Sequence, residues 1–136
     1  MSPDGSGCSP PSSTSLPDGI WFGTLKAVDT SAGTVGLDLA CWFGGDAANK
    51  AAAADGSSEI PVPNDYYIRD KVHTVYTLHA SPTVKVLELK NLPSWGAPTT
   101  GIAGAAKLLG DFPDRALVWV QVTDGWVVVV QQQYVP

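Results

Sequence analysis

The sequence lacks the features that point most directly to a nucleic-acid or membrane partner. It holds 8 Lys and Arg against 13 Asp and Glu, for a net charge of −5, and no basic residues cluster along it. The sequence therefore has no basic cluster that could bind the phosphate groups of a nucleic acid or of anionic lipids, and we expect no nucleic-acid partner. The longest strongly apolar run, Trp126 to Val130, is far too short to cross a bilayer, so we expect no transmembrane segment.

Charged residues make up only 15% of the chain, against about 25% in an average globular protein, whereas the hydrophobic fraction of 44% is ordinary. A chain of this composition can bury a core. Its 136 residues are enough for one core and leave too little sequence for a second. We therefore expect a single globular domain over residues 19–136.

The first 18 residues are almost all Ser, Pro, Gly, Asp and Thr. Such a segment cannot bury enough apolar surface to offset the loss of chain entropy, so residues 1–18 are predicted to form a flexible tether. Within it, Gly7-Cys8 and the Ser/Pro-rich sequence that follows resemble the start of a mature bacterial lipoprotein. This resemblance implies a location in the extracellular space or the cell envelope, and it makes Cys8 the candidate lipidation site.

Cysteine and histidine are also rare, with two of each. Cys8 and Cys41 lack the neighbours of a zinc site or of a thiol nucleophile. Cys41 falls on the apolar side of a strand pattern, which favours a buried free thiol; a disulfide with Cys8, or two unpaired cysteines, are the alternatives. His73 and His79 would lie about 20 Å apart on one strand face, too far to share an ion. We therefore expect no metal and no cofactor.

Apolar and polar residues alternate over much of the chain, which predicts strands. Residues 20–28 and 34–43 predict a hairpin around a turn at residues 29–33. In the second strand the odd-numbered positions should face the core. This alternation leaves Asp38 and Trp42 on the outer side of the strand.

Two short helices are predicted among the strands. The first covers the alanine-rich residues 47–54. Because it has no large apolar side chain, we expect it to plug the end of a barrel or to cover one face of a sheet. The second covers residues 101–109, and its buried stripe should consist of Ile102, Ala106 and Leu109.

Two further hairpins complete the predicted fold. One joins residues 72–78 to 83–90, and the other joins residues 116–123 to 126–135 through Asp124-Gly125, a strong hairpin signal. The last strand should be central in its sheet or, if it lies at an edge, pair with another copy of the chain. The expected fold class is α+β and β-rich, a small antiparallel barrel or curled sheet of about six to seven strands with two short helices.

The most unusual stretch is residues 61–70, where prolines, two adjacent tyrosines and three charged residues crowd together. Strand alternation places Tyr66 and Ile68 inward and Tyr67 and Arg69 on the other face. A polar and aromatic patch of this kind suits a sugar, a peptide end or a cation. The candidate binding residues are Asn64, Asp65, Tyr67, Arg69 and Asp70. In the alternative interpretation, these charges pair with other residues and the segment only pins a chain crossing.

Five short motifs stand in order along residues 18–136. They are Asp18-Gly19, Asp38-Leu39-Ala40, the NDYYIR motif at residues 64–69, and the segments 119–125 and 133–136. Together they resemble an uncharacterised family of small exported bacterial proteins, and NDYYIR is the most specific of them. That family tends to carry acidic residues near the C-terminus, where this chain has Gln131 and Gln132. The resemblance implies an exported location and no particular chemistry.

Three functional hypotheses follow. The first is a non-catalytic extracellular or cell-envelope module that binds a ligand or a partner protein of unknown identity. The second is a small hydrolase that uses Asp65 and His73, although no serine or cysteine shows the pattern of an activated nucleophile. The third is a structural subunit that self-assembles into a homo-oligomer through strand edges, with the C-terminal strand as the expected contact.

Overall fold

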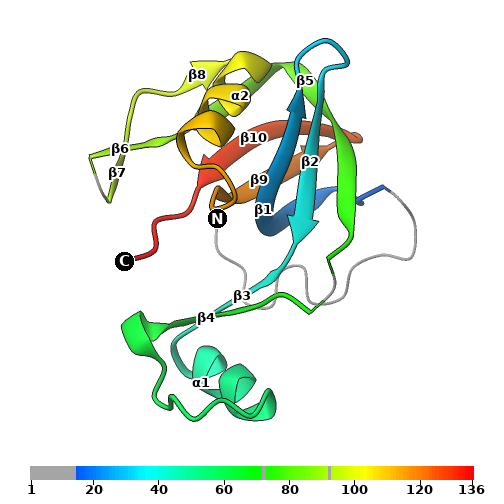
Figure 1. Ribbon diagram of the computed structural model, residues 1–136. Coiled ribbons are helices and arrows are strands. Elements are labelled where there is room, and N and C mark those ends of the chain that lie inside the picture. The colour runs from blue at the N-terminus through cyan, green and yellow to red at the C-terminus, as the bar shows by residue number, and fades with distance from the viewer. Residues whose placement is uncertain (1–14, 72, 92) are drawn as a thin grey trace.

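Six strands form a mixed sheet that curls into a partly closed ring, here called the barrel, and a separate two-stranded ribbon carries a helix away from it (Figure 1). This computed structural model describes residues 15–71, 73–91 and 93–136. The expected α+β, β-rich fold is confirmed. In chain order the elements are β1 (Gly19–Asp29), β2 (Thr34–Leu39), β3 (Cys41–Gly44), α1 (Gly45–Ala54), the 3-10 turn η1 (Pro63–Asp65), β4 (Tyr66–Arg69), β5 (Val75–Leu87), β6 (Leu89–Asn91), β7 (Ser94–Trp95), β8 (Thr99–Thr100), α2 (Ile102–Asp111), β9 (Leu117–Thr123) and β10 (Trp126–Gln132).

The barrel strands follow the order β10-β9-β1-β2-β5-β8, and β10 also pairs with β5, which closes the ring. The strand β10 is therefore hydrogen-bonded on both sides, antiparallel to β9 and parallel to β5. This is the central placement that the sequence left open for the last strand. Apolar side chains with almost no exposure fill the interior, among them Leu25, Leu37, Val84, Leu108, Val118 and Val130. Burial of each such side chain stabilises the fold by about 1.5–3 kcal/mol.

Helix α2 packs against β1 and β5 and completes this core. Ala105 and Leu108 are fully buried, and Ile102 and Leu109 are partly buried beside them. Of the predicted stripe, Ile102 and Leu109 pack against the core, whereas Ala106 is half-buried and does not, and the fully buried positions are Ala105 and Leu108 instead. The reason is that residues three apart lie on one helix face as well as residues four apart, so the spacing alone did not choose between them.

The predicted second hairpin is wrong, because β5 is one strand of 13 residues. Its first half pairs antiparallel with β2, from Val75 to His79, and its second half pairs parallel with β10, from Lys85 to Leu87. Pro82, which the sequence interpretation took as part of a turn, lies between these two halves. Proline has no backbone N–H, and at the point where β5 changes partner no ladder bond is lost.

The first and last hairpins are confirmed by the pairing of β1 with β2 and of β9 with β10. At the last turn, Asp124 and Gly125 both adopt positive φ, 52° and 80°. The carboxylate of Asp18 accepts hydrogen bonds from their backbone N–H groups at 2.9 and 3.2 Å. Leu16, within the predicted tether, is buried in the core. Residues 15–18 of that tether are described, and residues 1–14 lie outside the described residues.

Cys41 is buried and disulfide-bonded, so the predicted free thiol is wrong. The apolar strand pattern behind that prediction reports burial, and burial alone does not distinguish a thiol from a disulfide sulfur. The only other cysteine of the chain is Cys8. It lies outside the described residues, and so does the lipidation site predicted there.

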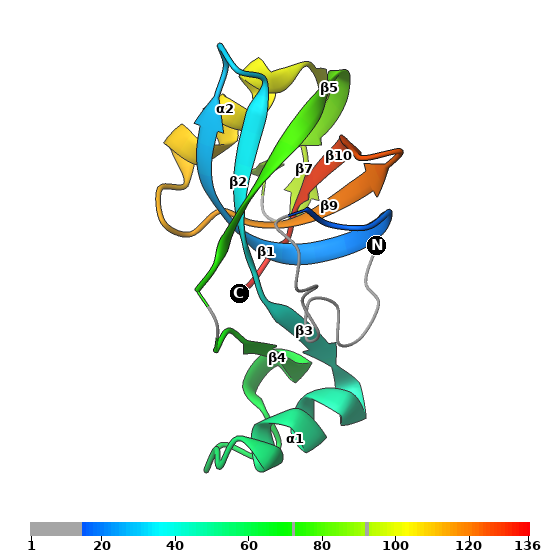
Figure 2. The same cartoon turned by 90° about the vertical axis from the view of Figure 1, so that its right-hand side faces the viewer.

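The strands β3 and β4 leave the barrel as an antiparallel ribbon, and α1 packs on it to form an appendage, residues 41–69 (Figure 2). The prediction that this helix plugs the barrel or covers the sheet is wrong. Ala48 and Ala52 of α1 are fully buried against Phe43 and Tyr67 of the ribbon. Small side chains let a helix lie close to a narrow ribbon, so this alanine helix needs no larger surface to bury its face.

An aromatic cluster holds the other face of the ribbon on the barrel. Trp42 stacks on Tyr66, with 4.8 Å between the ring centroids and 1° between the ring planes. The same Trp42 ring lies edge-on to Phe22 of β1 at 5.4 Å and to Trp119 of β9 at 6.2 Å. Trp42 is therefore on the outer side of the barrel wall, as predicted, but its neighbours cover it.

Gly23 of β1 lies very close to the backbone of Asp38 in β2. A methyl group at this position would overlap the backbone carbonyl of Asp38. We expect Gly23→Ala to lower the free energy of unfolding by about 1–3 kcal/mol, measured by chemical denaturation. Gly110→Ala is the matched control, since this exposed helix position has open space around it and alanine should stabilise it by about 0.5–1 kcal/mol. A Gly23→Ala protein as stable as the wild type would contradict the close approach.

Candidate functional site

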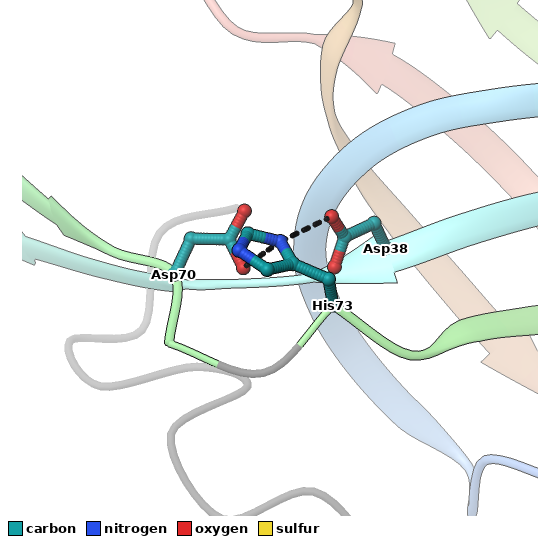
Figure 3. Close-up of side chains that lie close together, drawn as sticks. All are labelled: Asp38, Asp70 and His73. Carbon is teal, nitrogen blue, oxygen red and sulfur yellow. Dashed lines mark hydrogen bonds and ion pairs between the residues drawn. The ribbon is translucent and has the colours of Figure 1, made fainter.

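Two carboxylates and one imidazole meet where the appendage joins the barrel (Figure 3). Asp38 belongs to β2, Asp70 follows β4, and His73 precedes β5. Each residue offers one ligand atom, and these three atoms lie within 4.8 Å of one another. We call these residues the junction cluster.

The chain passes this point twice, and that crossing brings the three residues together. On the way out β2 leads into β3, and on the way back β4 leads into β5. The outgoing and returning segments pair on both sides of the junction, through β3 with β4 in the appendage and through Asp38 opposite Val75 in the barrel. Asp70 and His73 lie in the returning segment between these pairings, so they have to pass beside Asp38.

The junction cluster combines a deeply buried acid with an open side. Asp38 is only 4% exposed, although the sequence placed it on the outer side of its strand. The segment that returns from the appendage covers this side of the strand, which local alternation does not reveal. His73 Nδ1 is 3.4 Å from Asp38 Oδ2 and 3.5 Å from Asp70 Oδ1, and the His73 side chain is 72% exposed. The imidazole thus forms the solvent-facing side of the cluster.

The carboxylates of the cluster are under-satisfied. Oδ1 of Asp38 and Oδ1 of Asp70 are buried and have no hydrogen-bond partner among the residues that the structure describes. A buried polar atom left in this state costs about 1–3 kcal/mol. Burial and then the neighbouring charge of Asp38 raise the pKa of Asp70 above its ordinary value. The fold therefore disfavours the charged form of Asp70 unless a positive charge is added.

The donor set of the cluster suits a divalent cation. Carboxylate oxygen and imidazole nitrogen bind such ions at about 2.0–2.2 Å, so two donors of one ion stand at most about 4.4 Å apart. The cluster's donor atoms, within 4.8 Å of one another, converge on one ion after small side-chain rotations. A bound cation would also supply the positive charge that the buried carboxylates lack.

The predicted residues Tyr67 and Arg69 face α1. The Tyr67 hydroxyl and the Arg69 Nε both donate to Oδ2 of Asp55 at 2.9 Å, and Lys71 Nζ donates to Oδ1 at 2.8 Å. The Arg69 guanidinium also lies 5.1 Å from the ring centroid of Phe43. These contacts attach the end of α1 to β4. They match the alternative interpretation, in which the charged residues of this segment pair with other residues and hold the chain crossing in place. The acid that Arg69 pairs with is Asp55.

The other predicted binding residues, Asn64, Asp65 and Asp70, do not lie with Tyr67 and Arg69. Asp70 joins the junction cluster. Asn64 and Asp65 are exposed in the η1 turn, with positive φ of 56° and 61°, and they belong to neither group. His73 was paired with Asp65 in the hydrolase hypothesis, but its nearest acids here are Asp38 and Asp70.

Asp38 and Asp55 are the residues that the sequence interpretation missed. Asp38 carried a signal, because it is the only acid in the otherwise apolar stretch from residue 35 to 43. An acid in such a position is either solvated or built into a site. Asp55 carried none, since an acid just after a helix and before a glycine is an ordinary way to end that helix.

Comparisons of the chain with protein-family models, with curated proteins and with solved structures found no match. Of the helices that the structure describes, none has the length and apolar character to span a membrane. The function therefore has to follow from the chemistry of the site.

Asp55 is expected to hold the appendage together in a pH-dependent way. Hydrogen bonds from Arg69 and then from Lys71 keep the pKa of Asp55 well below its usual range. The stabilisation is thus present above the pKa of an unfolded Asp, about 3.9, and is lost as the pH falls below it. We expect Asp55→Asn to speed amide hydrogen exchange in residues 41–69 at neutral pH. Asp46→Asn, an exposed acid in the first turn of α1, is the control; equal exchange in both variants would contradict this role.

Asp70 is expected to behave in the opposite way. Because its pKa is raised in the folded state, its ionisation opposes folding once the pH is above that pKa. In buffer with a chelator at neutral pH, Asp70→Asn should raise the free energy of unfolding. Asp65→Asn, the exposed acid of the η1 turn, should leave it unchanged. A loss of stability in Asp70→Asn would show that the carboxylate is fully satisfied without a cation.

Proposed function

We propose that this protein is a non-catalytic binding module of the extracellular space or cell envelope, and that it holds a divalent cation at the junction cluster. The observation that carries the proposal is a pair of buried carboxylate oxygens, Oδ1 of Asp38 and Oδ1 of Asp70, that have no hydrogen-bond partner among the described residues; the exposed imidazole of His73 lies beside them, with Nδ1 3.5 Å from Asp70 Oδ1. A carboxylate buried where its charged form is disfavoured lowers the stability of the fold. Such a cost is expected where a ligand supplies the missing partner.

The donor set favours one class of cation. An imidazole suits Zn²⁺ and other first-row transition ions, whereas Mg²⁺ and Ca²⁺ favour sites built from oxygen alone. Three protein donors leave at least one coordination position for water or for a donor atom of another molecule. The exposure of His73 places this position toward solvent, so a bound ion could be reached by a ligand or a partner protein.

The proposed location has support from Cys41. Disulfides persist in oxidising compartments and are rare in reducing ones, so a buried disulfide-bonded cysteine supports an exported protein. The resemblance of Gly7-Cys8 to a lipoprotein start points the same way. The sulfur of Cys8 cannot carry a lipid and form a disulfide at the same time. The proposed location therefore does not include a lipid anchor on Cys8.

A cation at the junction cluster would also fasten the appendage. Asp38 is part of the barrel wall, whereas Asp70 and His73 belong to the segment that returns from the appendage. One ion bound to all three would link these two parts directly. The attachment of the appendage to the barrel would then depend on the cation.

No observation supports the hydrolase hypothesis or the self-assembly hypothesis. The hydrolase hypothesis needs Asp65 near His73, and the acids that contact His73 are Asp38 and Asp70. Self-assembly through the C-terminal strand needs a free strand edge, and β10 is paired with β9 and β5. Both stay untested as functions of this chain.

Isothermal titration of the chelator-treated protein with Zn²⁺ and with Mn²⁺ tests the proposal. We expect one ion to bind each chain and the affinity to fall as the pH is lowered, because protons compete for the same donor atoms. Asp38→Asn, Asp70→Asn and His73→Gln should each weaken binding by at least about tenfold. Saturation with the ion at 100 times its dissociation constant should stabilise the wild type by about 2.7 kcal/mol.

Asp65→Asn is the matched control, since it removes the same charge from the neighbouring η1 turn and should bind the ion as the wild type does. Equal loss of affinity in this control would assign the binding to general surface charge. Binding that survives both Asp38→Asn and Asp70→Asn would remove the junction cluster as the site.

A further inference from the structure

A hollow lies at the end of the barrel far from the appendage. It opens between the β1–β2 turn, the middle of β5, the first residue of α2 and the first residue of β10, and its volume is about 280 Å³. In the ladder of β2 with β5, His79 of this hollow is paired with Thr34 at one end, whereas Asp38 of the junction cluster is paired at the other. In Figure 1 the β1–β2 turn lies at the top and the appendage at the bottom. The mouth of a β-barrel is a frequent place for ligand binding.

The hollow exists because its walls carry little side-chain volume. Ala32, Gly33 and Ala80 line it. Gly33 has a positive φ of 69°, and nothing lies within 4 Å of the place where a Cβ would stand. The backbone there is already satisfied, since the Ala80 N–H donates to the Gly33 carbonyl at 2.9 Å. Pro82 and Ile102 complete an apolar floor.

One large aromatic ring stands at the rim. Trp126 is 47% exposed, although it begins a strand whose next residue, Val127, is fully buried. Its ring centroid is 6.0 Å from that of His79, and the two rings are inclined by 60°, so His79 does not stack flat on the indole. An exposed indole beside a hollow is an apolar surface that a ligand can cover.

The polar side chains at the hollow are few. They are the imidazole of His79 and the hydroxyl of Ser81, and no Lys, Arg, Asp or Glu lines the hollow. A phosphate or carboxylate ligand would find no cation to pair with here. A ligand that fits is one ring in size, is neutral, and has an apolar face for the indole together with hydroxyl groups for hydrogen bonds.

We propose that this hollow binds one uncharged sugar ring. The C–H face of the ring packs on the indole of Trp126, and the ring hydroxyls bond to His79 and Ser81. A volume of about 280 Å³ is at the lower limit of ligand pockets, which suits a single ring and not a longer chain. A ligand of this size with one aromatic contact should bind with a dissociation constant in the millimolar range. The site is independent of the cation site proposed above.

NMR titration of the ¹⁵N-labelled protein with glucose, galactose and N-acetylglucosamine tests the proposal. We expect at least one of these sugars to shift the indole N–H signal of Trp126 and the backbone signals of His79 and Ser81. Trp126→Ala should weaken binding at least about tenfold, and Trp126→Phe, which keeps a flat ring, should bind with intermediate affinity. If Trp126→Ala does not fold, the comparison of Trp126→Phe with His79→Ala takes its place.

Trp95→Ala is the matched control, because Trp95 is also exposed, at 44%, and does not line the hollow. It should bind the sugar as the wild type does, and so should Asp70→Asn, which separates this site from the cation site. The proposal is overturned if no sugar shifts these signals at 100-fold excess, or if Trp126→Ala binds unchanged. It is equally overturned if indole or glucose 6-phosphate binds more tightly than every neutral sugar, since the hollow would then select a planar or an anionic ligand.

Discussion

The pairing of β5 with two different strands is the constraint on which the rest of the structure depends. Its first half lies antiparallel to β2 and its second half lies parallel to β10, and this exchange closes the ring. It also sets both candidate sites. The start of β5 brings His73 against Asp38, and the point where β5 changes partner, around Pro82, leaves the hollow at the other end.

Two carboxylates close together in the sequence show how the environment decides whether a negative charge stabilises or opposes folding. Asp55 and Asp70 are both acids at the end of an appendage element. Asp55 accepts hydrogen bonds from Tyr67, Arg69 and Lys71, which lower its pKa, so its charge stabilises the fold. Burial and then the charge of Asp38 raise the pKa of Asp70, and its buried Oδ1 has no hydrogen-bond partner among the described residues. The first arrangement is complete within the chain, and the second is the one for which we propose a cation.

The appendage contacts the barrel in two chemically different ways. It is held to the barrel by the ring cluster around Trp42 on one face and by the junction cluster at its base. The first contact is apolar. The second contains ionisable side chains, so under the proposed function its strength would depend on a bound cation.

The sequence by itself determined the local elements: the first and last hairpins, both helices within a few residues, and the opposite facing of Tyr66 with Ile68 and Tyr67 with Arg69. Each depends on alternation, helix propensity or turn chemistry, which act between near neighbours. Only the tertiary structure decided that β5 continues past Pro82 as one strand and that α1 covers the ribbon. It also decided that Asp38 lies buried beside His73, 35 residues away in the chain. Each of these features depends on contacts between segments far apart in the chain. A local sequence pattern shows that a face is covered but not which distant segment covers it.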